Sequence, residues 1–219
     1  IYECIKHFNM KRVLFIDRDG TLIKETEDEQ IDTFNKLEFY PKVFQYLAKI
    51  SKELDFEIVM ITNQDGLGTE TFPEDTFWSV HNFIIETFKN ENIVFQEQFI
   101  DRTLAKDNAP TRKPNTGLLT KYFSNEYDLA NSFVIGDRLT DIELAKNLKS
   151  KGIYINDNTH LGTDEITVQR EELEPFIVLE TNDWETIYSF LKAKERTGSI
   201  SRITNETEIE ITLNLDGTG

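Results

Sequence analysis

The stretch LFIDRDGTLI, residues 14–23, joins a short apolar run to two aspartates separated by one residue. An apolar run of this length, here residues 13–16, is typical of a buried strand. Asp17 and Asp19 repel each other unless a cation or a shared proton lies between them. In an extended chain both side chains point the same way, and Gly20 lets the backbone turn closely around a ligand. The pair is therefore either an exposed turn or a chemical site.

Composition excludes several classes of protein. The 219 residues are 38% hydrophobic, which is enough for one α/β domain and a small addition. A formal net charge of -16 argues against a general nucleic-acid binder and against binding to anionic membranes. No run approaches the roughly 18 apolar residues of a membrane span. The single cysteine, Cys4, cannot form an internal disulfide and fits a reducing compartment, so we expect a cytoplasmic protein.

Short apolar runs alternate with segments of helical period along the chain. The predicted strands are residues 13–16, 58–61, 133–135 and 153–155, with a weaker one at 95–100. The predicted helices are residues 41–54, 73–90, 115–123 and 139–148. Residues 176–179 and 184–191 suggest a further strand and helix. This alternation predicts an α/β fold with a mostly parallel sheet and helices on both faces.

Ligands bind such sheets at the carboxyl ends of the strands, so the residues that follow each strand are informative. Three predicted strands end in polar clusters, DRDGT at 17–21, TNQDG at 62–66 and GDRLTD at 136–141, and RKP at 112–114 precedes a helical segment. Each cluster has a purely structural explanation as a turn, a helix cap, a charge in the first turn of a helix or a surface lysine. Their joint occurrence in this order favours a functional site.

A divalent cation would relieve the repulsion between the aspartates. Mg²⁺ prefers oxygen ligands and needs one or two carboxylates together with a substrate phosphate, and Asp17 and Asp137 are the candidate side-chain ligands. Such a set suits phosphoryl transfer, in which one carboxylate attacks phosphorus and a second carboxylic acid protonates the leaving oxygen. A lysine, a threonine hydroxyl and backbone N–H groups would neutralise the phosphoryl oxygens.

Taken together, DRDGT, the threonine of ITNQ, the lysine of RKP and GDRLTD resemble the four motifs of the haloacid dehalogenase superfamily of phosphatases. The resemblance spans about residues 10–148. It implies a three-layer Rossmann-like fold with a minimal cap and a magnesium-dependent enzyme. By this resemblance Asp17 is the nucleophile and Asp19 the general acid/base. Asp17, the backbone carbonyl of Asp19, and Asp137 would hold the metal, with Asp141 supporting them.

The same resemblance implies the groups that bind phosphate. Thr62 and Lys113 match the phosphate-binding positions, and we expect the adjacent Asn63 and Arg112 to contribute. The implied substrate is a small-molecule phosphate monoester.

A closer resemblance links FIDRDGTLI, MITNQDGLGTETFP, RKPNTG and VIGDRLTDI to the phosphatase half of bifunctional histidine-biosynthesis enzymes. It implies hydrolysis of L-histidinol phosphate, with imidazoleglycerol-phosphate dehydratase as the second activity of a longer protein. We expect upstream sequence at residues 1–9, the phosphatase domain at 10–195 and the first strand of a dehydratase domain at 196–219. Alternation of Ile209, Ile211, Leu213 and Leu215 with polar residues indicates that strand. An edge strand of the phosphatase is the alternative.

If a single strand ended the chain, its open edge would be a pairing hazard, so we expect this tail to be disordered or docked on a neighbour. Oligomerisation would then depend on the dehydratase domain.

One segment departs from the family pattern. Close relatives carry a zinc loop of three cysteines and a histidine before RKP, whereas these positions are Asp101, Thr103, Ala109 and Thr111 here. This set does not suit zinc, so none is expected, and the inference to a particular substrate weakens. A heptose-bisphosphate phosphatase is the alternative enzyme, and a non-catalytic scaffold is the alternative of another class. The acidic run at residues 25–29 is interpreted as a solvated loop rather than as an acidic rim for a cationic substrate.

Overall fold

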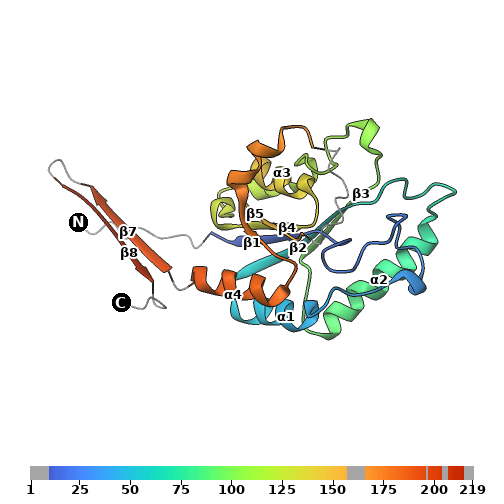
Figure 1. Ribbon diagram of the computed structural model, residues 1–219, viewed down its shortest axis with the longest axis horizontal. Coiled ribbons are helices and arrows are strands. Elements are labelled where there is room, and N and C mark those ends of the chain that lie inside the picture. Colours follow the sequence, from blue (N-terminus) through green and yellow to red (C-terminus); the bar gives the residue numbers. More distant parts are fainter. Residues whose placement is uncertain (1–9, 157–165, 196, 204–206, 215–219) are drawn as a thin grey trace.

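The computed structural model describes residues 10–156, 166–195, 197–203 and 207–214. In this part of the chain, six parallel strands form one sheet in the order β3-β2-β1-β4-β5-β6 (Figure 1). Their bounds are β1 Arg12–Ile16, β2 Phe56–Asn63, β3 Glu97–Asp101, β4 Phe133–Gly136, β5 Lys151–Tyr154 and β6 Ile177–Glu180. Each apolar run that predicted a strand forms one, and the predicted parallel α/β fold is confirmed.

Alternate residues of β1 face opposite sides of the sheet. Leu14 and Ile16 belong to a core shared with three helices, whereas Val13 and Phe15 belong to a second core on the other face. Burial of each such side chain contributes roughly 1.5–3 kcal/mol. The first core packs under α1 (Val43–Glu53), α2 (Glu74–Asn90) and α4 (Trp184–Glu195), and the second under α3 (Leu139–Leu148). Helices therefore cover both faces, with α3 alone among them on its side in Figure 1.

The segment predicted as a helix at residues 115–123 is a 3-10 helix, Gly117–Phe123, rather than an α-helix. Its two buried side chains are Leu119 and Tyr122, and the backbone is kinked at Leu119, where φ is -107° and ψ is 15°. A Cβ on Gly117 would lie 2.4 Å from the carbonyl oxygen of Pro110, so this turn is pressed against the preceding loop. Packing against that loop, rather than helical propensity, determines its form.

The predicted strand and helix after residue 175 are β6 and α4. Trp184 opens α4, is fully buried, and donates its indole N–H to the carbonyl oxygen of Thr21 at 3.2 Å. The last helix therefore packs under the loop that follows β1.

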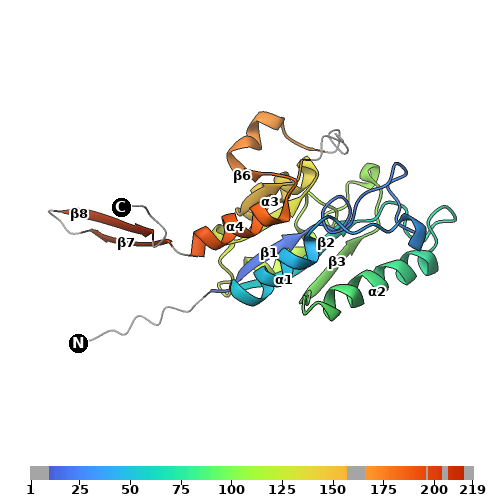
Figure 2. The same cartoon turned by 60° about the horizontal axis from the view of Figure 1, so that its bottom comes forward.

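The tail is a hairpin and not a single strand. β7 (Thr197–Ile203) pairs antiparallel with β8 (Glu208–Asn214), with Ile200 opposite Ile211. This sheet is separate from the six-stranded one, so the edge-strand alternative is wrong, as is the expectation of a lone strand. Figures 1 and 2 show the hairpin extending from the end of α4 away from the domain. Its assignment to a dehydratase domain remains a prediction, and residues 1–9 and Leu215 lie outside the described residues.

Among the described residues, no helix combines the length and the apolar character that crossing a bilayer requires.

Candidate active site

The carboxyl ends of β1, β2 and β4 bring the predicted residues together. Asp17 follows β1, Thr62 and Asn63 end β2, and Asp137 follows β4. The main-chain N–H of Asp17 donates to the carbonyl oxygen of Ile135 in β4 at 2.9 Å. The chain runs from β1 to β2 and β3 on one side and returns to β4 on the other. The strand order therefore switches between β1 and β4, where ligands bind in such sheets.

Two glycines allow the motifs to approach each other. Gly20 has φ of 70°, and a Cβ there would lie 2.0 Å from a carboxylate oxygen of Asp137. A Cβ on Gly136 would lie 2.2 Å from the carboxylate carbon of Asp141. Any side chain at either position would displace a carboxylate of the site.

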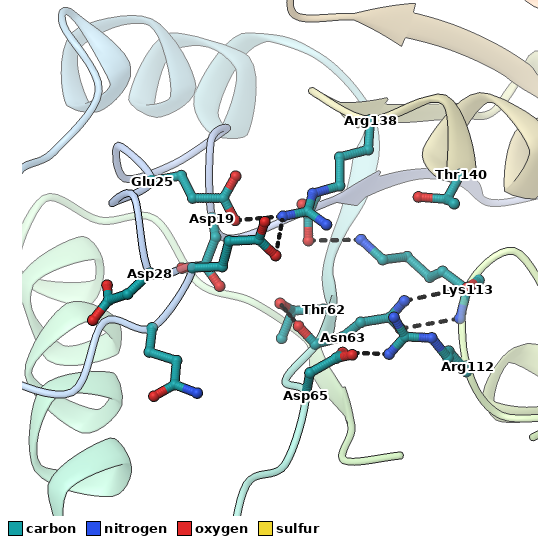
Figure 3. A pocket seen from close by; sticks show the side chains of 13 residues that line it. Asp19, Glu25, Asp28, Thr62, Asn63, Asp65, Arg112, Lys113, Arg138 and Thr140 are labelled. Atoms are coloured by element: carbon teal, nitrogen blue, oxygen red, sulfur yellow. Dashed lines mark hydrogen bonds and ion pairs between the residues drawn. The ribbon is translucent and has the colours of Figure 1, made fainter. Parts of the chain in front are cut away.

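A cavity of about 190 Å³ opens at this edge of the sheet (Figure 3). Six of the eight predicted residues line it, namely Asp17, Asp19, Thr62, Asn63, Arg112 and Lys113. The other two, Asp137 and Asp141, lie beside Asp17: one carboxylate oxygen from each of the three lies within 4.8 Å of the others.

Lys113 joins two of these carboxylates. Its ammonium lies 2.7 Å from an oxygen of Asp17 and 2.7 Å from an oxygen of Asp141, and all three side chains are at most 7% exposed. Burial alone would lower the pKa of Lys113, but the charges of Asp141 and Asp17 outweigh it and raise this pKa. The lysine is therefore a fixed cation at the floor of the cavity. Burial raises the pKa of Asp17 to about 6 in spite of Lys113, because Asp141 and Asp19 add repulsion.

Asp137 has the features of a cation ligand. Its Oδ1 is buried without a hydrogen-bond partner in the structure. Burial raises the pKa of Asp137 well above its ordinary value, and repulsion from Asp17 and Asp141 adds to this effect. Asp141 differs, because one of its oxygens accepts from Lys113 and the other from the N–H of Arg138 at 3.1 Å, where it caps α3. Asp141 is thus a buried residue that caps α3. The alternative interpretation, a solvated charge in the first turn of a helix, is wrong.

Asp19 is held in place by the side chains of Arg18 and Gln64. Both of its oxygens accept hydrogen bonds from Arg18 at 3.0 Å, and one also accepts from the amide of Gln64 at 2.6 Å. The same amide donates to the hydroxyl of Thr62 at 2.8 Å. The side chain of Asp19 is 10% exposed, and the residue lines the cavity.

Asn63 and Arg112 both fix the backbone around Lys113. The amide of Asn63 accepts from the N–H of Lys113 at 3.0 Å and donates to the carbonyl oxygen of Lys113 at 3.2 Å, so it positions that backbone. Arg112 donates to the carbonyl oxygen of Thr103 at 2.9 Å and pairs with Asp65 across the cavity mouth. Thr62 and Asn63 are part of β2, so they do not form the helix cap considered above.

Three of the four positions that correspond to the family's zinc loop form a hydrogen-bonded cluster. Asp101 is 4% exposed; one carboxylate oxygen accepts from the N–H and hydroxyl of Thr103, and the other accepts from the hydroxyl of Thr111. The main-chain oxygen of Asp101 also accepts from the N–H of Gln64 at 2.7 Å. The carboxylate of Asp101 therefore connects the two ends of the loop at residues 101–111, which directly precedes Arg112, by hydrogen bonds.

The acidic run at residues 25–29 is more than the solvated loop that we favoured. Glu27, Asp28 and Glu29 are exposed, as expected, but Glu25, Asp28 and Glu29 also line the cavity. Glu25 pairs with Arg138 at 2.7 Å, and burial raises the pKa of Glu25 to about 7 despite that pairing. A hydrogen bond from Lys36 lowers the pKa of Asp28 to about 2, so this carboxylate stays ionised. Arg138 also pairs with Glu29 at 3.2 Å, and Lys36 pairs with Asp28 at 2.6 Å, so the three carboxylates outnumber the two cations that pair with them. The mouth of the cavity is therefore acidic on balance, because the fold brings this loop over the site.

Residues that the sequence analysis gave no role also line the cavity: Gln30, Asp65, Arg138 and Thr140. Arg138 directly follows Asp137 after β4, so the strand-end argument already pointed to it. Gln30 comes from a distant loop, and no spacing in the sequence indicated it.

Comparison with known proteins agrees with this geometry. Residues 12–159 match the family described as polynucleotide kinase 3 phosphatase. The chain is 54% identical over 211 residues to the histidine biosynthesis bifunctional protein HisB of Bacteroides fragilis, covering 95% of this chain and 55% of that protein. It is 49% identical over 214 residues to the protein of the same name from Spirosoma linguale, covering 96% and 56%. The chain thus spans about half the length of these curated relatives.

Solved structures show the same fold. The D,D-heptose 1,7-bisphosphate phosphatase of B. bronchiseptica, complexed with magnesium and phosphate, superposes with a TM-score of 0.69 at 19% identity, covering 84% of this chain and 99% of that one. A HAD-like phosphatase from Mesorhizobium loti gives 0.64 at 21% identity, covering 83% and 84%. With the matched family covering residues 12–159, the chain belongs to the polynucleotide kinase 3 phosphatase family and has the fold of the haloacid dehalogenase superfamily of phosphatases.

Proposed function

We propose that this domain hydrolyses L-histidinol phosphate to L-histidinol and phosphate, as a magnesium-dependent phosphomonoesterase of histidine biosynthesis. The observation that carries the proposal is the pairing of Asp17 with Lys113 at 2.7 Å on the floor of a cavity whose mouth is acidic. A fixed cation beside a carboxylate suits binding of a phosphoryl group and attack upon it. The names of the two relatives support the pathway, and the dehydratase activity would belong to the longer protein.

The residues present fit a magnesium ion. The donor set consists of carboxylates, and a buried oxygen of Asp137 has no hydrogen-bond partner in the structure. Asp17, the backbone carbonyl of Asp19, and Asp137 would hold the ion, with Asp141 orienting the site through Lys113 and the start of α3. The bound ion would neutralise charge on the phosphoryl oxygens and lower the repulsion between an anionic substrate and these carboxylates.

The reaction would proceed in two displacements by residues of this chain. A carboxylate oxygen of Asp17 forms a bond to phosphorus while the bond from phosphorus to the alcohol oxygen breaks, and Asp19 gives its proton to that oxygen. Water then attacks the aspartyl-phosphate, Asp19 takes a proton from it, and phosphate leaves with Asp17 restored. Lys113 and the hydroxyl of Thr62 stabilise the charge on the phosphoryl oxygens in both steps.

The substrate assignment rests on charge at the cavity mouth. Histidinol phosphate carries an ammonium group near its phosphate, so it presents an anion to Lys113 and a cation to the rim. The rim contributes Glu25, Asp28 and Glu29. A polynucleotide, as the name of the matched family suggests, would place further phosphates against these carboxylates, which disfavours it. The cavity of about 190 Å³ suits a small ester.

Phosphate release with Mg²⁺ tests the proposal. The substrates are histidinol phosphate, heptose bisphosphate, 4-nitrophenyl phosphate and a 3′-phosphorylated oligonucleotide. We expect the highest kcat/KM for histidinol phosphate and none for Asp17→Asn. A preference for heptose bisphosphate or for the oligonucleotide would overturn the substrate. No turnover of any ester by a folded protein would overturn the catalytic proposal and favour a scaffold.

A further inference from the structure

Arg18 stands between the two aspartates of the first motif and is fully buried, with 0% of the residue exposed. Arginine is rarely buried completely unless its charge is paired. None of the roles proposed above uses this side chain. Its surroundings therefore need an explanation of their own.

The guanidinium group of Arg18 grips the carboxylate of Asp19 at both oxygens. Nε donates to Oδ1 and one terminal nitrogen donates to Oδ2, each at 3.0 Å. The same nitrogen donates to the side-chain oxygen of Gln64 at 3.0 Å, and the amide of Gln64 returns a hydrogen bond to Oδ2 of Asp19 at 2.6 Å. Bidentate pairs of this kind restrict the direction of a carboxylate as well as stabilising it.

A second layer of side chains fixes Arg18 in turn. Its guanidinium carbon lies 4.8 Å from the centre of the Phe77 ring, and its other terminal nitrogen lies 3.5 Å from Nδ1 of His81. Burial and the charge of Arg18 lower the pKa of His81 to about 4, so the imidazole is neutral at pH 7. Nε2 then donates to the side-chain oxygen of Gln98 at 3.0 Å, which leaves the lone pair of Nδ1 facing Arg18. His81 also stacks on Phe77, with ring centres 5.1 Å apart.

The stability of the hydrophobic core does not explain this buried network of polar side chains. A buried ion pair adds little net stability over apolar residues of the same volume, because both charges must be desolvated. The pair does fix the direction in which the carboxyl group of Asp19 points. This matters because a general acid works only within hydrogen-bond reach of the oxygen that it protonates. A displacement of about 1 Å in such a group costs about 100-fold in rate.

We propose that Arg18, together with Gln64, is a positioning clamp that holds the carboxyl group of Asp19 in the orientation for proton transfer to the leaving oxygen. Oδ2 of Asp19 accepts two hydrogen bonds and Oδ1 accepts one, so the second lone pair of Oδ1 is the position that carries the transferred proton. This inference rests on the proposed function, in which Asp19 is the general acid/base. Gln64 extends the clamp to the phosphate-binding hydroxyl of Thr62 at 2.8 Å, so the acid and the phosphoryl site share one rigid frame. The alternative is that Arg18 serves only the stability of the fold.

The dependence of rate on the leaving group separates these two roles. A general acid matters for phenyl phosphate, which expels a basic phenolate, and much less for 4-nitrophenyl phosphate. With the full chain and Mg²⁺, we expect Arg18→Lys to lower kcat/KM about tenfold more for phenyl phosphate than for 4-nitrophenyl phosphate. The matched control is Arg12→Lys: Arg12 begins β1, whereas Arg18 follows that strand, and both stack on a phenylalanine ring, but Arg12 does not contact Asp19. This control should leave the ratio of the two rates unchanged.

A double-mutant cycle completes the test. If Arg18 acts through Asp19, then Arg18→Lys in an Asp19→Asn background should change neither rate by more than about twofold. Should Arg18→Lys fail to fold by circular dichroism, Gln64→Met serves in the same design, with the same selective loss expected. An unchanged rate ratio in a folded clamp variant, or full additivity in the cycle, would overturn the proposal. Failure of the folded, unmodified chain to release phosphate from histidinol phosphate as well as from both aryl esters would instead refute the proposed function.

Discussion

Replacing Asp17 with asparagine is expected to abolish phosphate release and, in metal-free buffer at pH 7, to stabilise the fold. The carboxylate is buried beside Asp141 and Asp19, and burial is the largest reason why its pKa rises from 3.8 to about 6. Lys113 opposes the rise without cancelling it. An asparagine of nearly the same shape keeps an oxygen for Lys113 but removes the charge.

The size of the effect follows from the two pKa values. The unfolded chain loses the Asp17 proton near pH 3.8 and the folded protein near pH 6, so stability is lost as the pH rises between these values and the full loss is present above pH 6. A separation of about two pH units corresponds to about 3 kcal/mol, which is an upper limit for the gain on substitution. We expect a gain of about 1–3 kcal/mol at pH 7 that disappears by about pH 4.

Urea unfolding of the unmodified chain and of Asp17→Asn, in EDTA at several pH values from 4 to 8, measures this difference. Comparing the two proteins cancels the titration of groups that do not interact with Asp17. Asp137 is not among them, because repulsion from Asp17 raises its pKa, and relief of this repulsion in the variant acts in the same direction as the loss of the Asp17 charge. A variant that is less stable at pH 7, or a difference that does not change with pH, would refute the argument that Asp17 is buried at a cost. Added Mg²⁺ should stabilise the unmodified chain more than the variant, because Asp17 is a proposed ligand.

Three further substitutions test other parts of the site. Lys113→Met should abolish turnover and lower the free energy of unfolding by about 3–5 kcal/mol, because it leaves two buried carboxylates without their cation; a loss below about 1 kcal/mol in urea unfolding would contradict this. Asp101→Asn should lower the free energy of unfolding by about 1–3 kcal/mol, since it removes one of the two carboxylate oxygens that accept from the partly buried hydroxyls of Thr103 and Thr111. Added zinc should not restore the loss, and rescue by zinc would refute the hydrogen-bonded closure of this loop. Glu25→Gln should raise KM for histidinol phosphate about tenfold and leave KM for 4-nitrophenyl phosphate unchanged; equal effects in steady-state assays would remove Glu25 from recognition of the ammonium group.

The sequence by itself predicted those features that depend on neighbouring residues only. The apolar run at residues 13–16 predicted a buried strand, and the position of Asp17 and Asp137 just after such runs predicted that they would meet. These conclusions need only the period of a strand and the rule that parallel strands end at one edge. The form of residues 117–123 was not predictable in this way, because contact with Pro110 decides it.

Contacts between distant segments were decided by tertiary structure alone. The acidic run at residues 25–29 is indistinguishable in sequence from a solvated loop, and only its position over the cavity makes it a candidate for recognition. The clamp on Asp19 joins Arg18, which follows β1, Gln64, which follows β2, and His81 of α2, and no spacing in the sequence relates these side chains. Residue types and local periods thus determined the fold class and the reactive groups. Direction, pairing and burial of those groups depend on which segments pack together, and this is a property of the whole fold.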